Sequence, residues 1–164
     1  MMVLIHYPEV PEELKDKVQH LGEHCDYGFV TILMGDQKGL QAKNVNNEWV
    51  DIDPIPGLFV VNIGDMLEKA TRRLYKSTPH RIFNLGKERF SIPYHFEPGY
   101  DVKVGELDIP LSEDDLKTIE RNKVYKRTDE ADISKLNRTS GEHYIAKYHS
   151  VFPPVAKKFL PPPK

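Results

Sequence analysis

Residues 24–91 decide the fold: the stretch opens with His24-Cys25-Asp26 and closes with Thr78-Pro79-His80-Arg81 and Arg89-Phe90-Ser91. Between these motifs, short apolar segments recur at intervals of about 8 to 12 residues, separated by glycine, proline, asparagine and aspartate. β-Branched and aromatic residues dominate the segments, which is typical of strands. The pattern predicts a β-sandwich or barrel rather than alternating strands and helices.

The strands that we predict cover most of the first hundred residues. They span 2–7, 23–26, 29–34, 40–45, 49–52, 58–63, 75–85 and 88–96. One short helix, 66–73, interrupts them, because Met66, Leu67 and Ala70 fall near one helical face.

The chain changes character after residue 100. Ser112, with Asp115 three residues later, is a weaker form of the capping box and predicts a helix over 111–124. A second helix is predicted over 141–152, a polar loop over 126–140, and a proline-rich tail that frays over 153–164. We therefore expect a mainly β core over 1–100, and a C-terminal helical extension with its tail over 101–164, packed on the same domain.

Composition narrows the classes of function. The chain has 164 residues, enough for one domain with a proper core, and 39% of them are hydrophobic. The net charge of −2 gives no electrostatic case for nucleic acid, and no apolar run is long enough for a membrane span. The single cysteine, Cys25, excludes an internal disulfide, and the N-terminus lacks a signal-type pattern. We expect a cytoplasmic protein that binds neither nucleic acid nor membrane.

His24 and Asp26 are the first candidate metal ligands. In a strand, residues i and i+2 point to the same face about 6.5–7 Å apart, so two such side chains can share one ion. His80, from another strand, is the leading candidate for the third ligand. Two imidazoles and one carboxylate leave coordination positions open, which suits non-haem iron(II) that binds oxygen.

Two other interpretations of these histidines remain open. His24 and Asp26 alone would more often be a surface histidine and a turn aspartate. His20 and His24 have the spacing of a helical zinc pair, but Gly22 between them disfavours a helix.

Arg89 and Ser91 also share one strand face. A guanidinium presents a planar fork to a carboxylate, and a neighbouring hydroxyl adds a hydrogen bond. Since an arginine inside a barrel is costly without an anion, an inward Arg89 predicts an acidic ligand. The alternative is a structural ion pair with a glutamate.

Taken together, these motifs resemble the jelly-roll core of the isopenicillin N synthase-like group of iron(II)/2-oxoglutarate-dependent oxygenases. The resemblance covers residues 2–100 in order and spacing. The matching pieces are Ile5-His6-Tyr7-Pro8, His24-Cys25-Asp26-Tyr27-Gly28, Gly39-Leu40-Gln41, Glu48-Trp49-Val50-Asp51, Pro56 to Asp65, Tyr75 to Arg81 and Arg89-Phe90-Ser91. It implies a double-stranded β-helix, or jelly roll, over 1–100.

The resemblance also implies a set of residue roles. His24, Asp26 and His80 would bind iron, and Arg89 with Ser91 would bind the distal carboxylate of 2-oxoglutarate. Tyr7 would add a hydrogen bond to this co-substrate, although a core tyrosine is an equal alternative. The reaction implied is hydroxylation, desaturation or cyclisation of a small organic substrate with O2, releasing succinate and CO2.

The chain departs from the group in one large feature. Members usually carry a long helical region before the Tyr-Pro strand, and this chain begins at that strand. An uncovered outer barrel face predicts self-association. Two rival functions remain: an isopenicillin N synthase-type oxidase without 2-oxoglutarate, and a catalytically silent truncated jelly roll acting as a binding module.

Several aromatic and histidine residues are assigned to packing. Trp49 and Phe59 are expected in the core. Tyr144 and Tyr148 are expected to pack from the last helix, with a cap over the active site as the alternative. The remaining histidines are interpreted as surface or packing residues: His6, His95, His143 and His149.

Overall fold

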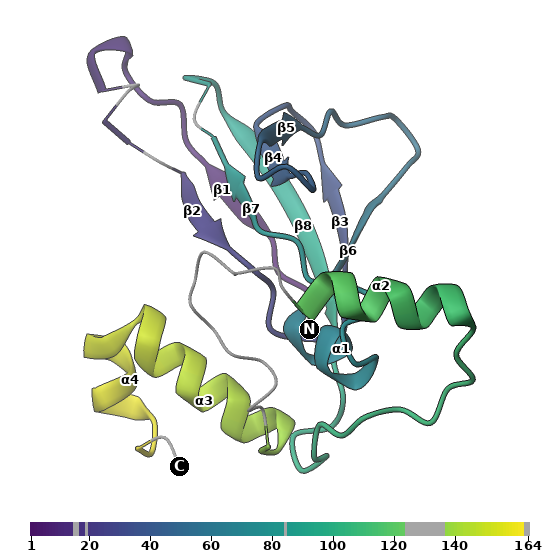
Figure 1. Cartoon of the computed structure of the whole chain (residues 1–164). Coiled ribbons are helices and arrows are strands. Elements are labelled where there is room, and N and C mark those ends of the chain that lie inside the picture. Colours follow the sequence, from purple (N-terminus) through teal and green to yellow (C-terminus); the bar gives the residue numbers. More distant parts are fainter. Residues whose placement is uncertain (15–16, 19, 84, 124–136, 163–164) are drawn as a thin grey trace.

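Eight strands form two antiparallel four-stranded sheets in the computed structural model, which describes residues 1–14, 17–18, 20–83, 85–123 and 137–162 (Figure 1). The strands are β1 (Ile5–Tyr7), β2 (Leu21–His24), β3 (Val30–Gly35), β4 (Leu40–Lys43), β5 (Trp49–Asp51), β6 (Val60–Ile63), β7 (His80–Ile82) and β8 (Arg89–Phe96). One sheet has the order β1-β8-β3-β6 and the other β2-β7-β4-β5. Two such interleaved sheets of eight strands form a jelly roll, as predicted.

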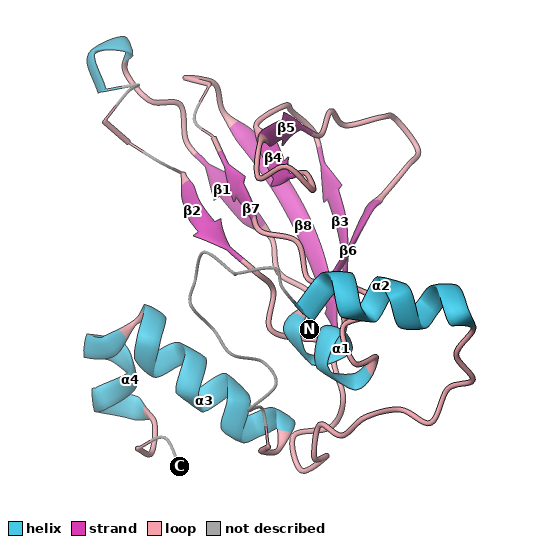
Figure 2. Cartoon of the chain, in the orientation of Figure 1, coloured by secondary structure: helices cyan, strands magenta, loops and turns pink. Residues whose placement is uncertain are grey.

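The helices gather at one end of the two sheets, except for a short 3-10 turn, η1 (Glu12–Leu14) (Figure 2). They are α1 (Asp65–Ala70), α2 (Glu113–Lys123), α3 (Ser140–Val151) and α4 (Pro153–Phe159). Among the described residues, none of these helices has the length and apolar character needed to cross a membrane.

The central strand β8 shows the alternation that builds the inside of the sandwich. Arg89 and Ser91 are each 3% exposed, whereas Phe90, between them, is 39% exposed. Successive strand residues point to opposite faces, so 89, 91, 93 and 95 face the other sheet. The inner apolar cluster is small and contains Tyr7, Leu40 and Ile82, with Ile5 and Leu33 packed against it. Its size leaves room inside the sandwich for polar side chains.

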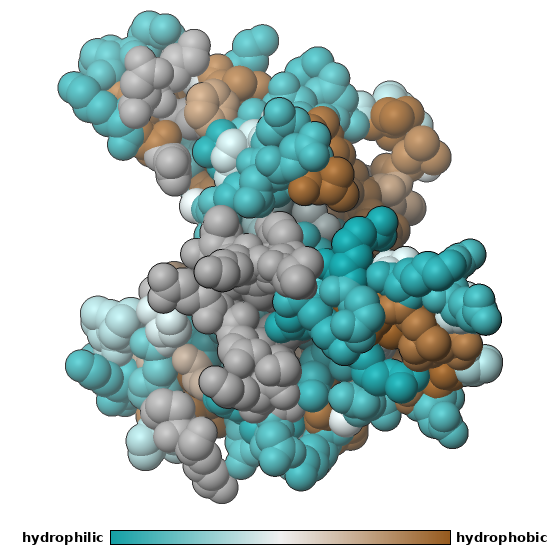
Figure 3. Space-filling view, viewed as in Figure 1, coloured by the Kyte–Doolittle hydropathy of each residue, from teal (hydrophilic) through white to brown (hydrophobic). Residues whose placement is uncertain are grey.

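Two aromatic residues predicted for the core lie elsewhere. Phe59 is 62% exposed, on an apolar loop between β5 and β6 that also exposes Ile55 and Leu58 (Figure 3). Trp49 is half-buried on β5, with Arg81 4.1 Å and Lys43 4.9 Å from its ring centroid. The prediction failed because hydrophobicity alone does not say which face of a strand or loop is covered.

Some predicted boundaries were also wrong. The strand expected over 75–85 is limited to His80–Ile82 within the described part, which excludes residue 84. The tail, expected to fray, forms α4 over Pro153–Phe159. Proline fits there because the first turn of a helix has no use for its missing N–H.

The predicted C-terminal helices are present. Ser112 and Asp115 exchange hydrogen bonds as expected at the start of α2. Thr139 and Glu142 form a full capping box for α3, which begins at Ser140. Most of the predicted loop over 126–140 lies outside the described residues.

Candidate metal centre

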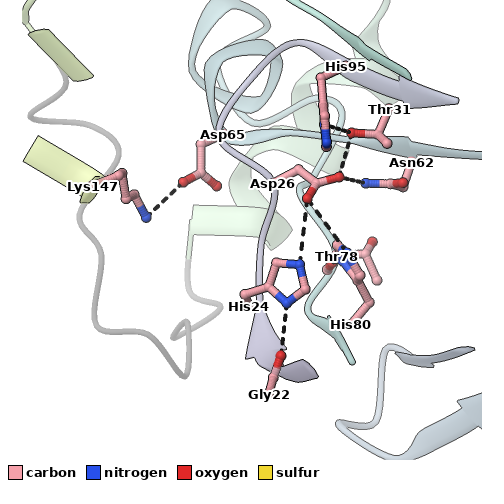
Figure 4. Close-up of polar contacts among 10 residues, drawn as sticks. All are labelled: Gly22, His24, Asp26, Thr31, Asn62, Asp65, Thr78, His80, His95 and Lys147. Carbon is pink, nitrogen blue, oxygen red and sulfur yellow. Dashed lines mark hydrogen bonds and ion pairs between the residues drawn. The ribbon is translucent and has the colours of Figure 1, made fainter. Parts of the chain in front are cut away.

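His24, Asp26 and His80 converge at the end of the second sheet. Their ligand atoms all lie within 4.8 Å of one another, a grouping that could hold a metal ion. His24 ends β2 and lies directly opposite His80 on β7, with the two ring centroids 4.3 Å apart. Asp26 follows two residues after the strand, and its Oδ1 is 3.7 Å from the Nε2 atom of each histidine (Figure 4). Asp26 was predicted within the strand but lies just past its end.

Both imidazoles are oriented by their own backbone. Nδ1 of His24 donates to the Gly22 carbonyl at 2.8 Å, and Nδ1 of His80 donates to the Thr78 carbonyl at 3.0 Å. Each bond leaves Nε2 as the nitrogen that faces Asp26. A fixed ring with one free nitrogen is the usual arrangement of a metal-binding histidine.

The two oxygens of the Asp26 carboxylate have different surroundings. Oδ2 accepts hydrogen bonds from Thr31 Oγ1 at 2.5 Å and from Asn62 Nδ2 at 2.7 Å, whereas Oδ1 faces the histidines (Figure 4). Thr31 Oγ1 also lies 3.0 Å from Nδ1 of His95. One oxygen is thus held by the protein, and the other is presented to the cluster.

The electrostatics favour the protonation states that bind a metal. Burial lowers the pKa of His24, and the neighbouring His80 lowers it further. Burial alone would raise the pKa of Asp26, but His80 and the hydrogen bonds from Thr31 and Asn62 outweigh it and lower the pKa. Neutral imidazole and ionised carboxylate are the ligand forms, so the lowered pKa values of His24 and Asp26 both favour the forms that accept a cation.

Asn62 and Thr31 were missed by the sequence analysis, and Asn62 gives a testable prediction. Replacing Asn62 by alanine removes one of the two hydrogen bonds that hold Oδ2 of Asp26, so we expect the iron(II) dissociation constant to rise about 10- to 100-fold. Anaerobic calorimetric titration measures this change. The matched control is Asn44→Ala, which removes an amide from an exposed turn; equal affinities for both variants would contradict the role.

The backbone after Asp26 is held by the start of α1. The Asp65 N–H donates to the Asp26 carbonyl at 2.8 Å, and the Met66 N–H donates to the Gly28 carbonyl at 3.0 Å. A Cβ at Gly64 would lie 2.3 Å from the Gly28 carbonyl oxygen, so only glycine permits this approach. Hydrogen bonds to the Asp26 carboxylate and to the loop backbone therefore both hold the loop that carries Asp26.

Arg89 lies at the other end of the inner face. Its Nε donates to the Gln37 carbonyl at 3.2 Å, and its guanidinium carbon is 5.1 Å from the Tyr7 ring centroid. The Nη1 atom is buried with no hydrogen-bond partner, and no glutamate pairs with the side chain, among the residues described. Burial lowers the pKa of this guanidinium, although Tyr7 and Asp36 oppose the shift. A buried cation with an unpaired donor is the feature that an acidic ligand would satisfy.

Gly35 leaves the space that Arg89 occupies. A Cβ at Gly35 would lie 2.9 Å from Nη2 of Arg89.

Ser91 pairs across the sheet with Gly35 and with Ile5, and Tyr7 pairs with Arg89. Tyr7, Arg89 and Ser91 are all nearly fully buried, so the three candidates for an anion site share one patch of the inner face.

The cavities around these two groups are separate. Arg89 lines two cavities of about 170 and 230 Å³, which are bounded by residues other than the His-Asp-His cluster. A third cavity, of about 190 Å³, lies beside the cluster. Its lining residues are Met1, His24, Asp26, Tyr27, His95, Glu97, Tyr144 and Tyr148.

Tyr144 packs against the cluster of Met66 and Val104, as predicted. Together with Tyr148 and His95 it also lines this pocket, which was the alternative for the two tyrosines. Helix α3, which carries both tyrosines, is fastened to the core by Lys147, whose Nζ is 3.2 Å from Asp65 Oδ2 (Figure 4). Alternation along β8 could have placed His95 on the inner face, but no sequence pattern shows which face of α3 meets the sheets.

Comparison with known proteins agrees with this geometry. Residues 1–98 match the model of the 2OG-Fe(II) oxygenase superfamily. A probable iron/ascorbate oxidoreductase of Dictyostelium discoideum is 36% identical over 149 residues, covering 88% of this chain and 39% of the relative. A homoarginine-6-hydroxylase of Glycine max is 41% identical over 115 residues, covering 66% of this chain and 35% of the relative.

A solved structure is similar as well. A full-length Neurospora crassa protein, crystallised in complex with alpha-KG and thymine, superposes with a TM-score of 0.70 at 27% identity, over 92% of this chain and 44% of that chain. The chain spans only about two-fifths of the length of the curated relatives it matches first.

Proposed function

The chain belongs to the 2OG-Fe(II) oxygenase superfamily, and from this premise we propose that it oxidises a small organic substrate with iron(II), 2-oxoglutarate and O2, releasing succinate and CO2. The observation that carries the proposal is the His24-Asp26-His80 cluster, whose two nitrogens and one oxygen are the donor set that suits oxygen-binding iron(II). Hydroxylation, desaturation and cyclisation are the outcomes open to such an enzyme.

We propose a role for each candidate residue. His24, Asp26 and His80 hold the metal, and Arg89 with Ser91 binds the distal carboxylate of 2-oxoglutarate. Tyr7 contributes a hydrogen bond and packs against the guanidinium, since its ring centroid lies 5.1 Å from the Arg89 guanidinium carbon. Bound iron(II) would activate O2, the oxidant, and 2-oxoglutarate would supply two electrons as it is oxidised to succinate and CO2. The protein orients the ligands and lines the substrate pocket.

The division of the chain follows from these roles. We propose that residues 1–100 form the oxygenase core and that 101–164 is a helical extension on the same domain. The extension supplies two pocket residues, Tyr144 and Tyr148. We also propose a cytoplasmic location, which the single cysteine, Cys25, buried and outside any disulfide, supports.

An anaerobic titration tests the function. Iron(II) and then 2-oxoglutarate are added to the purified protein, and the weak visible charge-transfer band of the chelate is followed. We expect the band, and succinate once oxygen and a substrate are supplied. Iron binding without a band would favour the isopenicillin N synthase-type oxidase, and no iron binding would favour the silent binding module.

The outer face of the β1-β8-β3-β6 sheet supports a proposal about assembly. Its exposed side chains are apolar across three adjacent strands: Ile32 and Met34 on β3, Val61 on β6, and Phe90, Tyr94 and Phe96 on β8. The 21 residues of the four strands give a flat footprint of roughly 330 Å² before side-chain relief is counted. This is roughly half of the ~600 Å² per partner of the smallest stable interfaces, so we expect the association to be weak. We propose that a second copy of this chain covers the face, because a patch without charge can pair with itself about a two-fold axis.

Val61→Lys tests this assembly. Val61 lies on the edge strand β6 beside Ile32 of β3. A lysine buried there against an apolar partner leaves an unpaired charge, so we expect the dimer dissociation constant to rise at least about tenfold. Sedimentation velocity over a concentration series measures it. The matched control is Val45→Lys, at an exposed turn on the other sheet. A wild-type chain that sediments as a monomer at every concentration would refute the proposal.

A further inference from the structure

The pocket beside the metal cluster contains one carboxylate that the proposed function does not use. Glu97 directly follows β8, two residues after His95, so the two side chains share the inner face of the strand. Both residues line the 190 Å³ pocket together with His24 and Asp26. Glu97 therefore lies where a substrate would be held against the metal.

Tyr144 fixes the position of this carboxylate. The Tyr144 hydroxyl donates a hydrogen bond to Oε1 of Glu97, joining α3 to the end of β8. Burial raises the pKa of Tyr144, and Glu97 raises it further, so the phenol remains a donor throughout the accessible pH range. A carboxylate offers about four acceptor positions, and Tyr144 occupies one of them.

The cations near Glu97 are bonded to other groups. The Met1 ammonium, which lines the same pocket, donates to the His95 carbonyl at 2.7 Å. Within the part of the chain that the structure describes, no lysine or arginine forms an ion pair with it. Lys147, the cation on the pocket helix, lies 3.2 Å from Asp65 Oδ2 instead. A half-buried carboxylate of this kind attracts a positively charged ligand and repels an anionic one.

Aromatic rings complete the surroundings. Tyr27 and Tyr144 meet edge to face with centroids 5.9 Å apart, and Tyr148, one helical turn after Tyr144, also lines the pocket. Electron-rich ring faces stabilise a cation within about 6 Å of the centroid. Lys147 Nζ already lies 5.1 Å from the Tyr27 ring centroid, so Glu97, Tyr144 and Tyr148 form the part of the pocket that suits a basic nitrogen group.

We propose that Glu97 is the substrate-recognition residue and that the prime substrate carries a positively charged nitrogen group, an ammonium or a guanidinium. Tyr144 is a positioning residue, since it acts through Glu97. The inference rests on the proposed function, because it takes this pocket as the place of oxidation.

Probes of equal size and different charge test the proposal. The anaerobic protein, loaded with iron(II) and 2-oxoglutarate, is titrated calorimetrically with butylguanidinium and with its neutral isostere, the amide N-butylurea. We expect the wild type to bind the cation about tenfold or more tightly than the amide, the effect of one charge-assisted hydrogen bond in a half-buried site. Failure of the cation to bind, or equal affinities for both probes, would overturn the proposal.

Substitutions assign the preference to Glu97. Glu97→Gln keeps the size and an acceptor for Tyr144 but removes the charge, and we expect it to abolish the cation preference. Glu97→Asp retains the charge and should retain a reduced preference, whereas Tyr144→Phe should reduce it several-fold. The control Glu120→Gln changes the net charge equally on the exposed face of α2, and an equal loss there would also refute the role.

The same samples separate this inference from the proposed function. Glu97 is not among the proposed ligands, so the iron(II) and 2-oxoglutarate affinities of Glu97→Gln should match those of the wild type. A wild-type protein that binds neither iron(II) nor 2-oxoglutarate would count against the oxygenase function. Intact affinities with no cation preference would count against Glu97 alone.

Discussion

Replacing His80 by alanine is expected to raise the iron(II) dissociation constant more than about 100-fold, the upper cost of losing a supporting residue around a metal. The variant removes one of three converging ligands and leaves Oδ1 of Asp26 with only His24 beside it. His24 and Asp26, the two proposed ligands that remain, are too few to hold the iron, so turnover should be abolished. Anaerobic calorimetric titration measures the affinity, and succinate formation measures turnover.

His6→Ala is the control for this result. His6 is exposed on the outer side of β1, where its Nε2 lies 2.9 Å from Glu88 Oε1. The control makes the same histidine-to-alanine change away from the cluster, so the affinity for iron(II) should be unchanged. If His80→Ala bound iron as tightly as the control, the third ligand would lie elsewhere in the chain.

Replacing Arg89 by leucine is expected to raise the apparent KM for 2-oxoglutarate by one or more decades. A carboxylate that loses a buried charged partner loses about 2–5 kcal/mol, and Arg89 is 3% exposed with a donor available for such a partner. Iron(II) affinity should remain at the wild-type value, because Arg89 lines cavities apart from the His-Asp-His cluster. Steady-state kinetics and the charge-transfer band provide the two measurements.

A matched control and a second variant sharpen the result for Arg89. Arg121→Leu removes a guanidinium from the exposed surface of α2 and should leave the KM unchanged. Gly35→Ala keeps Arg89 but places a Cβ 2.9 Å from its Nη2, so the guanidinium must shift. An unchanged KM in both Arg89→Leu and Gly35→Ala would place the co-substrate elsewhere.

The spacing of the motifs predicted the architecture because strand alternation is a local property. Arg89 and Ser91, two residues apart within β8, indicate a shared face without knowledge of the rest of the chain. His24 and Asp26 also converge, although Asp26 lies past the end of β2 and strand alternation does not place it. The meeting of His24 and His80 required a further inference, since it depends on β2 pairing with β7 across more than fifty residues. The family resemblance supplied that register.

The supporting residues were not predictable in the same way. Thr31 and Asn62 lie in the middle of apolar strands, and their contact with Asp26 depends on β3 pairing with β6. The position of Tyr144 depends on how α3 docks against the sheets, which no periodicity in the sequence determines. The metal cluster was therefore predictable from the sequence, whereas the residues that orient it and line its pocket were not.

The attachment of α3 has a consequence for how such a protein could acquire a new substrate. The metal cluster belongs to the sheets, whereas two pocket residues belong to a helix fastened through Lys147–Asp65 and Tyr144–Glu97. Variation at 144 and 148 would alter the pocket wall without disturbing iron chemistry. The fold thus separates reactivity from selectivity, and a directed-evolution library confined to this helix should yield altered specificities from a largely intact population of active variants.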